Sequence, residues 1–282
     1  MIGKIQIPGT DKCICRVGFG CARVFAGSEL TLAARLIEAA LVAGIRHFDT
    51  APAYGNGHSE SALGVVLAGV SDVTITTKIG IQNVDSTYVP RPTAVAYRRF
   101  IRPLLSYVPN VKTRLLGLAE WSRHRAPLAA PAVQRHRLAP SDVLRKFDES
   151  LKRLRRDAVD LYLIHEPEQV ELTDELHELF TNLQKQRVIG TFGLAYGGEV
   201  DAAPDFGAIV QSKYHPELPA RCASGKLRIF HGALRSPRQV GVRALGTNGL
   251  DVRLNNVLQE CPDSAIIFSA SAPHQIKGHA FL

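Results

Sequence analysis

The chain has 282 residues, of which 45% are hydrophobic and 21% are charged, a balance typical of a globular protein with a sizeable core. No apolar run reaches the roughly 18 residues needed to cross a bilayer, which excludes a membrane-spanning protein. The amino-terminal segment lacks the architecture of a signal peptide, so we expect a cytoplasmic protein that does not bind membranes.

Three apolar segments in the first part of the chain are predicted strands, and amphipathic segments between them are predicted helices. The predicted strands are 15–20, 45–49 and 72–78. The predicted helices are 29–44 and 59–69. Ser59 is a candidate N-cap for the second helix, and Glu60 suits the positive start of that helix.

After an interruption at 80–140, the same alternation resumes and continues to the end of the chain. The predicted strands are 158–165, 188–195, 206–211, 226–234 and 264–270. The predicted helices are 141–156, 173–187, 254–262 and the start of a last helix at 272–280.

The order of these elements predicts the fold. Strands that alternate with helices indicate a parallel sheet, because the right-handed crossover between parallel strands needs a helix. Eight such units indicate an α/β protein with a closed (β/α)8 TIM barrel rather than an open doubly wound sheet. An open sheet that binds a dinucleotide would carry G-x-G-x-x-G after the first strand, whereas VGFGCARV supplies only Gly18 and Gly20. We therefore predict one barrel domain over 1–282.

Residues 80–140 form a long insertion after the third predicted strand. A structureless loop of this length is uncommon in a compact domain, and the segment contains apolar and aromatic residues, as in AVAYRRFIRPLLSY, so we expect some helix in it. Because it follows a strand, we expect it over the mouth of the barrel, at the catalytic end. It is either a substrate lid or an inert excursion.

The net charge is +8, and much of the excess lies between Arg91 and Arg156, in runs such as RRFIR and KRLRR. Nucleic-acid binding is one interpretation of such a basic segment. No RNP-like motif, zinc finger or helix-turn-helix accompanies it, so we favour a solvated basic face that attracts anionic ligands.

The cysteines are odd in number and irregularly spaced, at Cys13, Cys15, Cys21, Cys222 and Cys261. A disulfide framework is not expected in a chain this large and apolar. No CxxC pair or histidine partner has the spacing of metal ligands, so we predict ordinary thiols and no metal site.

Four polar side chains are placed to meet at the mouth of the predicted barrel, where the carboxyl ends of the strands converge. Asp49 ends the second strand and Tyr54 follows in its loop, Lys78 ends the third strand, and His165 ends the fourth. Each residue alone has an ordinary structural interpretation, as a turn cap, a packed ring or a solvated charge. Together they form a set suited to acid–base catalysis.

The chemistry of this set is that of a general acid. Tyrosine titrates at about 10 in a model peptide, a neighbouring lysine ammonium lowers this pKa, and Asp49 would hold the ammonium of Lys78 in place. His165 can donate a hydrogen bond to a substrate carbonyl oxygen. The set predicts that Tyr54 protonates an oxygen that gains negative charge when hydride reaches its carbon, and accepts a proton from an alcohol in reverse.

The segments FDTAPAYGNGHSESALG, TTKIG and DLYLIHEPE resemble the aldo-keto reductase family. The resemblance covers most of the chain and implies a (β/α)8 barrel with a catalytic tetrad. Matched residue by residue, the tetrad falls on Asp49, Tyr54, Lys78 and His165. It also implies a nicotinamide cofactor bound across the mouth without a Rossmann fold.

The resemblance implies cofactor contacts in the last strands. Gln211 matches the glutamine that binds the carboxamide, and Phe230 or His231 lies where the family stacks an aromatic ring on the nicotinamide. The final segment resembles the part of the family that binds the adenosine phosphate. Its implied contacts are Ser269, Ser271, Gln275 and Lys277. An arginine that the family often uses for the 2′-phosphate is not at its usual place, and Lys277 is the candidate substitute. NADP is nevertheless preferred over NAD.

The resemblance implies an NAD(P)-dependent oxidoreductase that interconverts an aldehyde, ketone or sugar lactone with its reduced form. The sugar and aldose dehydrogenases are the nearest branch. Ala195 and Tyr196 replace a Ser-Asn pair that the family uses on the cofactor. A catalytically weak protein that senses the cofactor is therefore the alternative.

Overall fold

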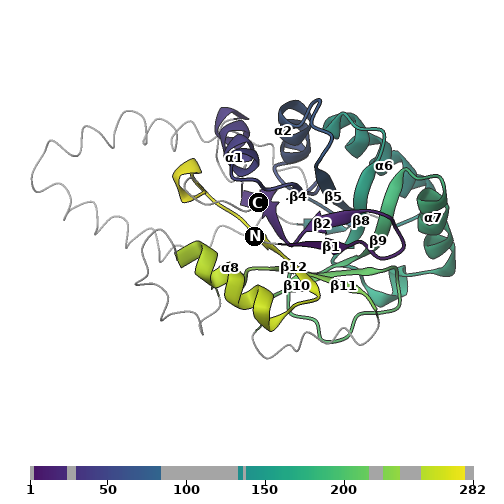
Figure 1. The fold of residues 1–282 in the computed structure, drawn as a ribbon. Coiled ribbons are helices and arrows are strands. Elements are labelled where there is room, and N and C mark those ends of the chain that lie inside the picture. The colour runs from purple at the N-terminus through teal and green to yellow at the C-terminus, as the bar shows by residue number, and fades with distance from the viewer. Residues whose placement is uncertain are drawn as a thin grey trace, which may run out of the picture. The chain divides into compact units, whose positions relative to one another are not determined.

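Eight parallel strands close into a barrel in the computed structural model of the protein (Figure 1). They are β3 (Val17–Gly20), β4 (His47–Asp49), β5 (Thr74–Ile79), β8 (Val159–His165), β9 (Ile189–Ala195), β10 (Ile209–Lys213), β11 (Leu227–His231) and β12 (Ser264–Phe268). Around the barrel, β3, β4, β5, β8, β9, β10, β11 and β12 follow one another, and β12 pairs with β3. The structure describes residues 3–23, 30–83, 133–135, 138–215, 225–235 and 249–276.

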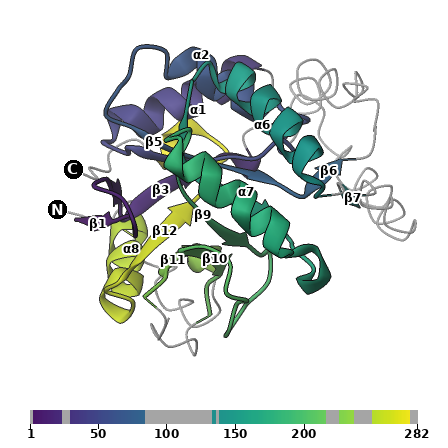
Figure 2. The same ribbon diagram turned by 90° about the vertical axis from the view of Figure 1, so that its right-hand side faces the viewer.

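The helices lie around the outside of the barrel (Figures 1 and 2). They are α1 (Leu30–Val42), α2 (His58–Val66), α6 (Pro140–Leu154), α7 (Asp174–Lys185) and α8 (Gly249–Glu260). Short 3-10 helices are η1 (Cys21–Arg23), η3 (Gln169–Glu171), η4 (Ala233–Arg235) and η6 (Pro273–Gln275). The predicted (β/α)8 barrel is thus confirmed, since all eight predicted strands are present and belong to it.

Local sequence accounts for the ends of the helices. Pro140 opens α6, where its fixed φ suits the first turn and its missing N–H removes no helical hydrogen bond. Thr173 caps α7, because its hydroxyl accepts a hydrogen bond from the amide of Leu176 at 3.2 Å. Beyond η6, the predicted last helix at 272–280 lies outside the described residues.

An amino-terminal hairpin covers one end of the barrel. Its strands β1 (Lys4–Gln6) and β2 (Cys13–Cys15) pair antiparallel. Ile7 and Ile14 of the hairpin are fully buried and belong to the same apolar cluster as Leu161 near the start of β8. Lys12 pairs with Asp160 of β8 at 2.9 Å. The hairpin therefore covers the amino-terminal end of the strands.

Helices α2 and α6 approach each other very closely at Gly64. A Cβ atom at this position would lie 2.3 Å from the carbonyl oxygen of Arg153, so any other residue would force the two helices apart. This contact brings the last turn of α2 against the last turn of α6.

The chain divides into two compact units, Met1–Ile81 with Arg135–Leu282, and Gln82–Gln134. The second unit is described only where β6 (Ile81–Asn83) and β7 (Val133–Arg135) form a two-stranded sheet. The predicted lid at 80–140 therefore falls largely outside the described residues and stays a prediction.

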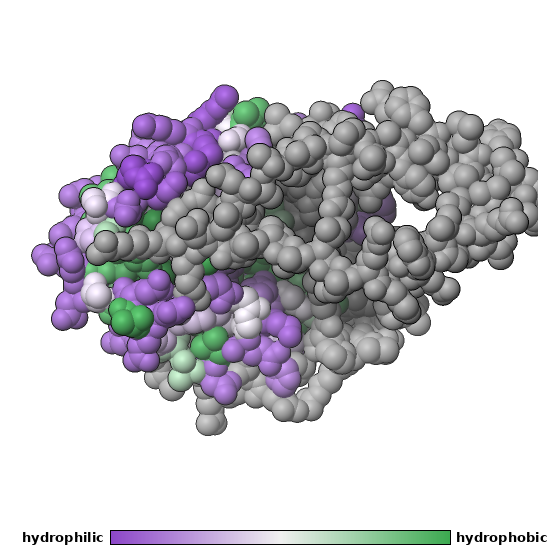
Figure 3. Space-filling view, turned by 180° about the vertical axis from the view of Figure 1, so that it is seen from behind, coloured by the Kyte–Doolittle hydropathy of each residue, from purple (hydrophilic) through white to green (hydrophobic). Residues whose placement is uncertain are grey.

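The surface of the described residues is mostly hydrophilic on the face shown in Figure 3, with hydrophobic residues in small groups. Large hydrophobic side chains are strongly exposed at Val42 and Val170. No helix in the described ranges is long and apolar enough to span a membrane. Within the same ranges, no three His, Cys, Asp or Glu side chains are grouped to hold a metal ion, and Cys222 lies outside them.

Candidate active site

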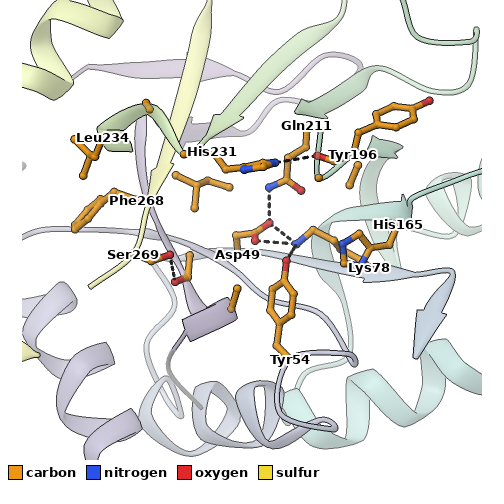
Figure 4. A pocket seen from close by; sticks show the side chains of 17 residues that line it. Asp49, Tyr54, Lys78, His165, Tyr196, Gln211, His231, Leu234, Phe268 and Ser269 are labelled. Atoms are coloured by element: carbon orange, nitrogen blue, oxygen red, sulfur yellow. Dashed lines mark hydrogen bonds and ion pairs between the residues drawn. The ribbon is translucent and has the colours of Figure 1, made fainter. Parts of the chain in front are cut away.

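The four predicted side chains meet in one pocket at the carboxyl end of the barrel (Figure 4). Asp49 is the last residue of β4, Lys78 lies one residue before the end of β5, and His165 ends β8. Tyr54 comes from the loop between β4 and α2. The pocket has a volume of about 280 Å³, and parallel strands bring these residues together because their carboxyl ends share one rim.

Lys78 is the centre of the hydrogen-bond network. Its Nζ donates to both carboxylate oxygens of Asp49 at 2.8 Å, to the backbone carbonyl of Thr50 at 2.9 Å and to the hydroxyl of Tyr54 at 3.3 Å. The ammonium also lies 4.9 Å from the centre of the Tyr54 ring. These contacts orient the lysine toward the phenol.

The Lys78–Asp49 pair is almost fully withdrawn from solvent, with 2% and 5% of the two side chains exposed. Burial alone would lower the pKa of Lys78, but the carboxylate of Asp49 and the phenol of Tyr54 outweigh it and raise this pKa. Lys78 is therefore a permanent cation at neutral pH, and its charge faces Tyr54.

Burial raises the pKa of Tyr54, and the ammonium of Lys78 opposes this shift only in part. The expectation of a lowered pKa is therefore wrong for the net shift, although the lowering contribution of Lys78 is present. A raised pKa keeps the phenol protonated at neutral pH, as a proton donor requires.

The loop that carries Tyr54 turns sharply just after it. Gly55, Asn56 and Gly57 have φ angles of 61°, 52° and 83°, all in the left-handed region that glycine adopts freely and asparagine more readily than most residues. The sequence GNG therefore lets the chain reverse and enter α2 while the tyrosine points back to Lys78.

His165 faces Tyr54 across the pocket. The two ring centroids are 6.0 Å apart with the rings nearly perpendicular, at 88°. Burial, together with Lys78 and His231, lowers the pKa of His165 to about 3. The imidazole is therefore neutral, with one N–H available to orient a substrate oxygen.

Gln211 on β10 joins the network from the opposite wall. Its Nε2 donates to Oδ2 of Asp49 at 2.9 Å. Its Oε1 is buried and has no hydrogen-bond partner in the described part of the chain. A buried acceptor without a partner is costly, and a ligand amide N–H would satisfy it. The carboxamide of a nicotinamide ring has such a donor, so this side of the pocket fits the implied cofactor.

Of the two ring candidates on β11, only His231 lines the pocket. Phe230 is fully buried in the core, where its ring packs edge-on against Tyr214 at 5.7 Å. Alternate residues of a strand point to opposite faces, so the two cannot share the role. His231 forms a hydrogen bond from Nε2 to the backbone oxygen of Tyr196 at 2.9 Å.

The implied phosphate contacts are less complete. Ser269 lines the pocket and donates to the carbonyl of Gly20 at 2.8 Å. Gln275 accepts from the amides of Ser271 and Ala272 at 2.7 and 3.2 Å. Neither Ser271 nor Gln275 lines the pocket. Lys277 lies outside the described residues.

Sequence reasoning missed the role of Thr50, which acts through its backbone carbonyl, a group that no residue type reveals. Cys21 follows β3 but does not line the pocket. It is fully buried, and burial near Asp49 raises the pKa of its thiol, in agreement with the predicted ordinary thiol.

Fold and site together define a (β/α)8 barrel with a pocket of buried titratable side chains at its carboxyl end. The model of the aldo/keto reductase family matches residues 16–230, and the chain belongs to this family. A D-threo-aldose 1-dehydrogenase from a Pseudomonas species is 30% identical over 190 residues, which are 62% of this chain and 46% of that protein. The match thus spans less than half of that relative.

Solved structures support the fold. The holo form of an aldo-keto reductase from Bacillus halodurans matches with a TM-score of 0.67 at 19% identity, over 98% of this chain and 89% of that one. A glycerol dehydrogenase from Gluconobacter oxydans matches with a TM-score of 0.65 at 19% identity, over 98% of this chain and 88% of that one.

Proposed function

We propose that the protein is an NAD(P)-dependent oxidoreductase that interconverts a small carbonyl compound and its alcohol, with Tyr54 as the general acid and base. The observation that carries the proposal is the position of Lys78, between Asp49 at 2.8 Å and the Tyr54 hydroxyl at 3.3 Å. Membership of the aldo/keto reductase family supports the same reaction class.

The side chains divide the chemistry among them. The bound cofactor supplies or accepts the hydride. In reduction, His165 donates a hydrogen bond that orients the carbonyl oxygen, and Tyr54 transfers its proton to that oxygen as negative charge develops. The ammonium of Lys78 then stabilises the phenolate that remains, and Asp49 keeps the ammonium in place.

The cofactor is proposed to bind along the wall formed by β9 to β12. Gln211 would accept from the carboxamide through its unpartnered Oε1, and His231 would lie against the nicotinamide ring. Ser269 lines the pocket, which supports it as a contact for the phosphate-bearing part of the cofactor. Ser271, Gln275 and Lys277 stay predictions. We prefer NADP to NAD, with Lys277 as the partner of a 2′-phosphate.

The proposed substrate class is a small polyhydroxylated aldehyde, ketone or sugar. The names of two similar proteins, an aldose dehydrogenase and a glycerol dehydrogenase, support compounds rich in hydroxyl groups. A pocket that combines Tyr54, His165 and His231 offers polar groups to such a substrate.

A second candidate function is a cofactor sensor with weak turnover. Ala195 and Tyr196 line the pocket where the family carries a Ser-Asn pair, so the side chains that the family uses on the cofactor are absent at these two positions. Tight cofactor binding without turnover on any substrate would favour this candidate.

One experiment separates the two. The absorbance of NADPH and NADH is followed with a panel of aldehydes and aldoses, and binding of each cofactor is measured by fluorescence, for the parent and Tyr54→Phe. We expect the variant to lose about 10²–10⁴-fold in turnover and to bind the cofactor as before. Equal turnover by both proteins would remove Tyr54 from the reaction.

A further inference from the structure

The first turn of α2 contacts the ends of two neighbouring strands of the site. Ser59 and Glu60 follow His58, the first residue of the helix, and both are fully buried, so Ser59 is not the N-cap that the sequence predicted. The hydroxyl of Ser59 lies 2.8 Å from the hydroxyl of Thr50, the residue after Asp49. The carboxylate of Glu60 accepts a hydrogen bond from the hydroxyl of Thr77 at 2.6 Å. The first bond thus reaches a residue whose backbone carbonyl accepts from Lys78, and the second reaches the residue directly before Lys78.

The Thr77 bond lies on the opposite side of β5 from the pocket. Successive side chains of a strand point to opposite faces, so Thr77 points outward to α2 while Lys78 points inward to Asp49 and Tyr54. Backbone pairing with β4 and β8 sets the register of β5. The bond to Thr77 adds a restraint from outside, at the residue directly before Lys78.

Glu60 is itself held from the other side. Its second carboxylate oxygen pairs with Nε of Arg153 of α6 at 2.6 Å, and Arg153 also donates to the hydroxyl of Ser150 at 3.2 Å. The side chain of Arg153 passes so close to Gly57 that a Cβ there would lie 2.8 Å from it. Since Gly57 ends the loop of Tyr54, one ion pair touches both the strand of Lys78 and the loop of the tyrosine.

We propose that Glu60, held by Arg153, is a positioning residue that acts through Thr77 to set the distance between Lys78 and Tyr54. This inference rests on the proposed function for its catalytic consequence, but its geometric content concerns the chain alone. Neither Glu60 nor Thr77 lines the pocket, so neither touches the substrate.

A shift of Lys78 would change the proton transfer in a defined direction. The ammonium of Lys78 lowers the pKa of Tyr54 against the larger effect of burial. Moving the ammonium away raises this pKa further. Carbonyl reduction needs the protonated phenol, so the loss of activity at high pH would move to higher pH. A substitution that only loosens the fold would not move it.

The test compares Thr77→Val with Thr77→Ser and a matched control, Thr74→Val. Thr74 lies at the other end of β5, where its hydroxyl contacts His47 at 2.9 Å and donates to the carbonyl of Arg46 at 3.2 Å. Crystal structures of the three variants give the distance from Lys78 Nζ to Tyr54 Oη, and kcat and KM are measured across pH.

We expect Thr77→Val to lengthen that distance from 3.3 Å to beyond about 4 Å, outside hydrogen-bond range. Its kcat should fall about 10-fold with KM little changed, because a small misplacement of a reacting group is costly. The alkaline limb of its pH–rate profile, where activity is lost at high pH, should move to higher pH. Thr77→Ser should show the distance, the kcat and the alkaline limb of the parent, and so should Thr74→Val. An unchanged distance and limb in Thr77→Val would overturn the proposal.

Two variants of Glu60 extend the test. Glu60→Gln keeps an acceptor for Thr77 and should retain the parent distance, whereas Glu60→Ala should behave as Thr77→Val. If Glu60→Ala does not fold, Thr77→Val alone decides. If the parent shows no turnover, the proposed function fails, and the measured distances still decide whether Glu60 positions Lys78.

Discussion

The two ends of the barrel each carry a lysine–aspartate pair of nearly the same length, and the pairs differ in everything else. Lys78 and Asp49 at the mouth are 2.8 Å apart with 2% and 5% of their side chains exposed. Lys12 and Asp160 at the hairpin end are 2.9 Å apart, but 57% of Lys12 is exposed. Distance alone therefore does not tell what a salt bridge does. Burial decides, because water screens the second pair and not the first.

Their further partners differ in the same way. Lys78 also donates to Thr50 and Tyr54, and Asp49 accepts from Gln211, so the buried pair is part of a network aimed into a pocket. Asp160 instead accepts from the backbone amide of Ile75 at 2.8 Å. The mouth pair contacts the phenol of Tyr54 in the pocket, whereas the other pair fastens a hairpin to a strand.

The largest effect is expected from Lys78→Met, which breaks the mouth pair. The carboxylate of Asp49 would remain buried without its cation, a situation that costs about 3–5 kcal/mol. Loss of the cation beside Tyr54 should also lower turnover by at least about 10²-fold. Denaturant unfolding and the cofactor absorbance assay measure the two effects. A variant with parent-like stability and turnover would show that the network is not needed.

Acid should lower the free energy of unfolding through His47, a fully buried residue at the start of β4. Burial lowers the pKa of His47 to about 4, whereas the unfolded chain binds this proton near 6.5. The unfolded state therefore takes up the proton first, and stability falls as pH drops from about 6.5 to 4, by about 3 kcal/mol.

Urea unfolding at pH 7.5 and 4.5 measures this loss in the parent and in His47→Asn, whose amide can still contact Thr74. The variant should show the smaller loss between the two pH values. An equal loss in both proteins would assign the acid sensitivity to other groups.

The smallest effect is expected from Lys12→Met. The lysine is largely exposed, so its ion pair contributes at most about 1 kcal/mol, and the site is at the other end of the barrel. Thermal unfolding should move little and turnover should stay as in the parent. If this variant lost as much stability as Lys78→Met, the contrast between the two ends would be wrong.

Much of the site could be predicted because strand ends are visible in a sequence. Asp49, Lys78 and His165 each close an apolar run, and a parallel barrel brings such ends together wherever they occur along the chain. The rhythm of eight strands and their helices was predictable for the same reason, since period and glycine stops are local signals.

Other features could not be predicted because they depend on burial or on the backbone. The net pKa shift of Tyr54 follows from how much water its pocket excludes, which the residue type does not tell. The choice of His231 over Phe230 depends on which face of β11 points inward. The engagement of Gln275 with the amide of Ser271 is a local cap, and a family resemblance does not reveal it.

The order of residues along the chain by itself determined which groups end the barrel strands and that eight strands alternate with helices, because these depend on short-range pattern. Only the tertiary structure decided how completely Lys78 and Tyr54 are buried, that α2 contacts β5 from outside through Glu60, and that a hairpin covers the far end. These features join residues distant in sequence, and their energies depend on the solvent that the fold excludes.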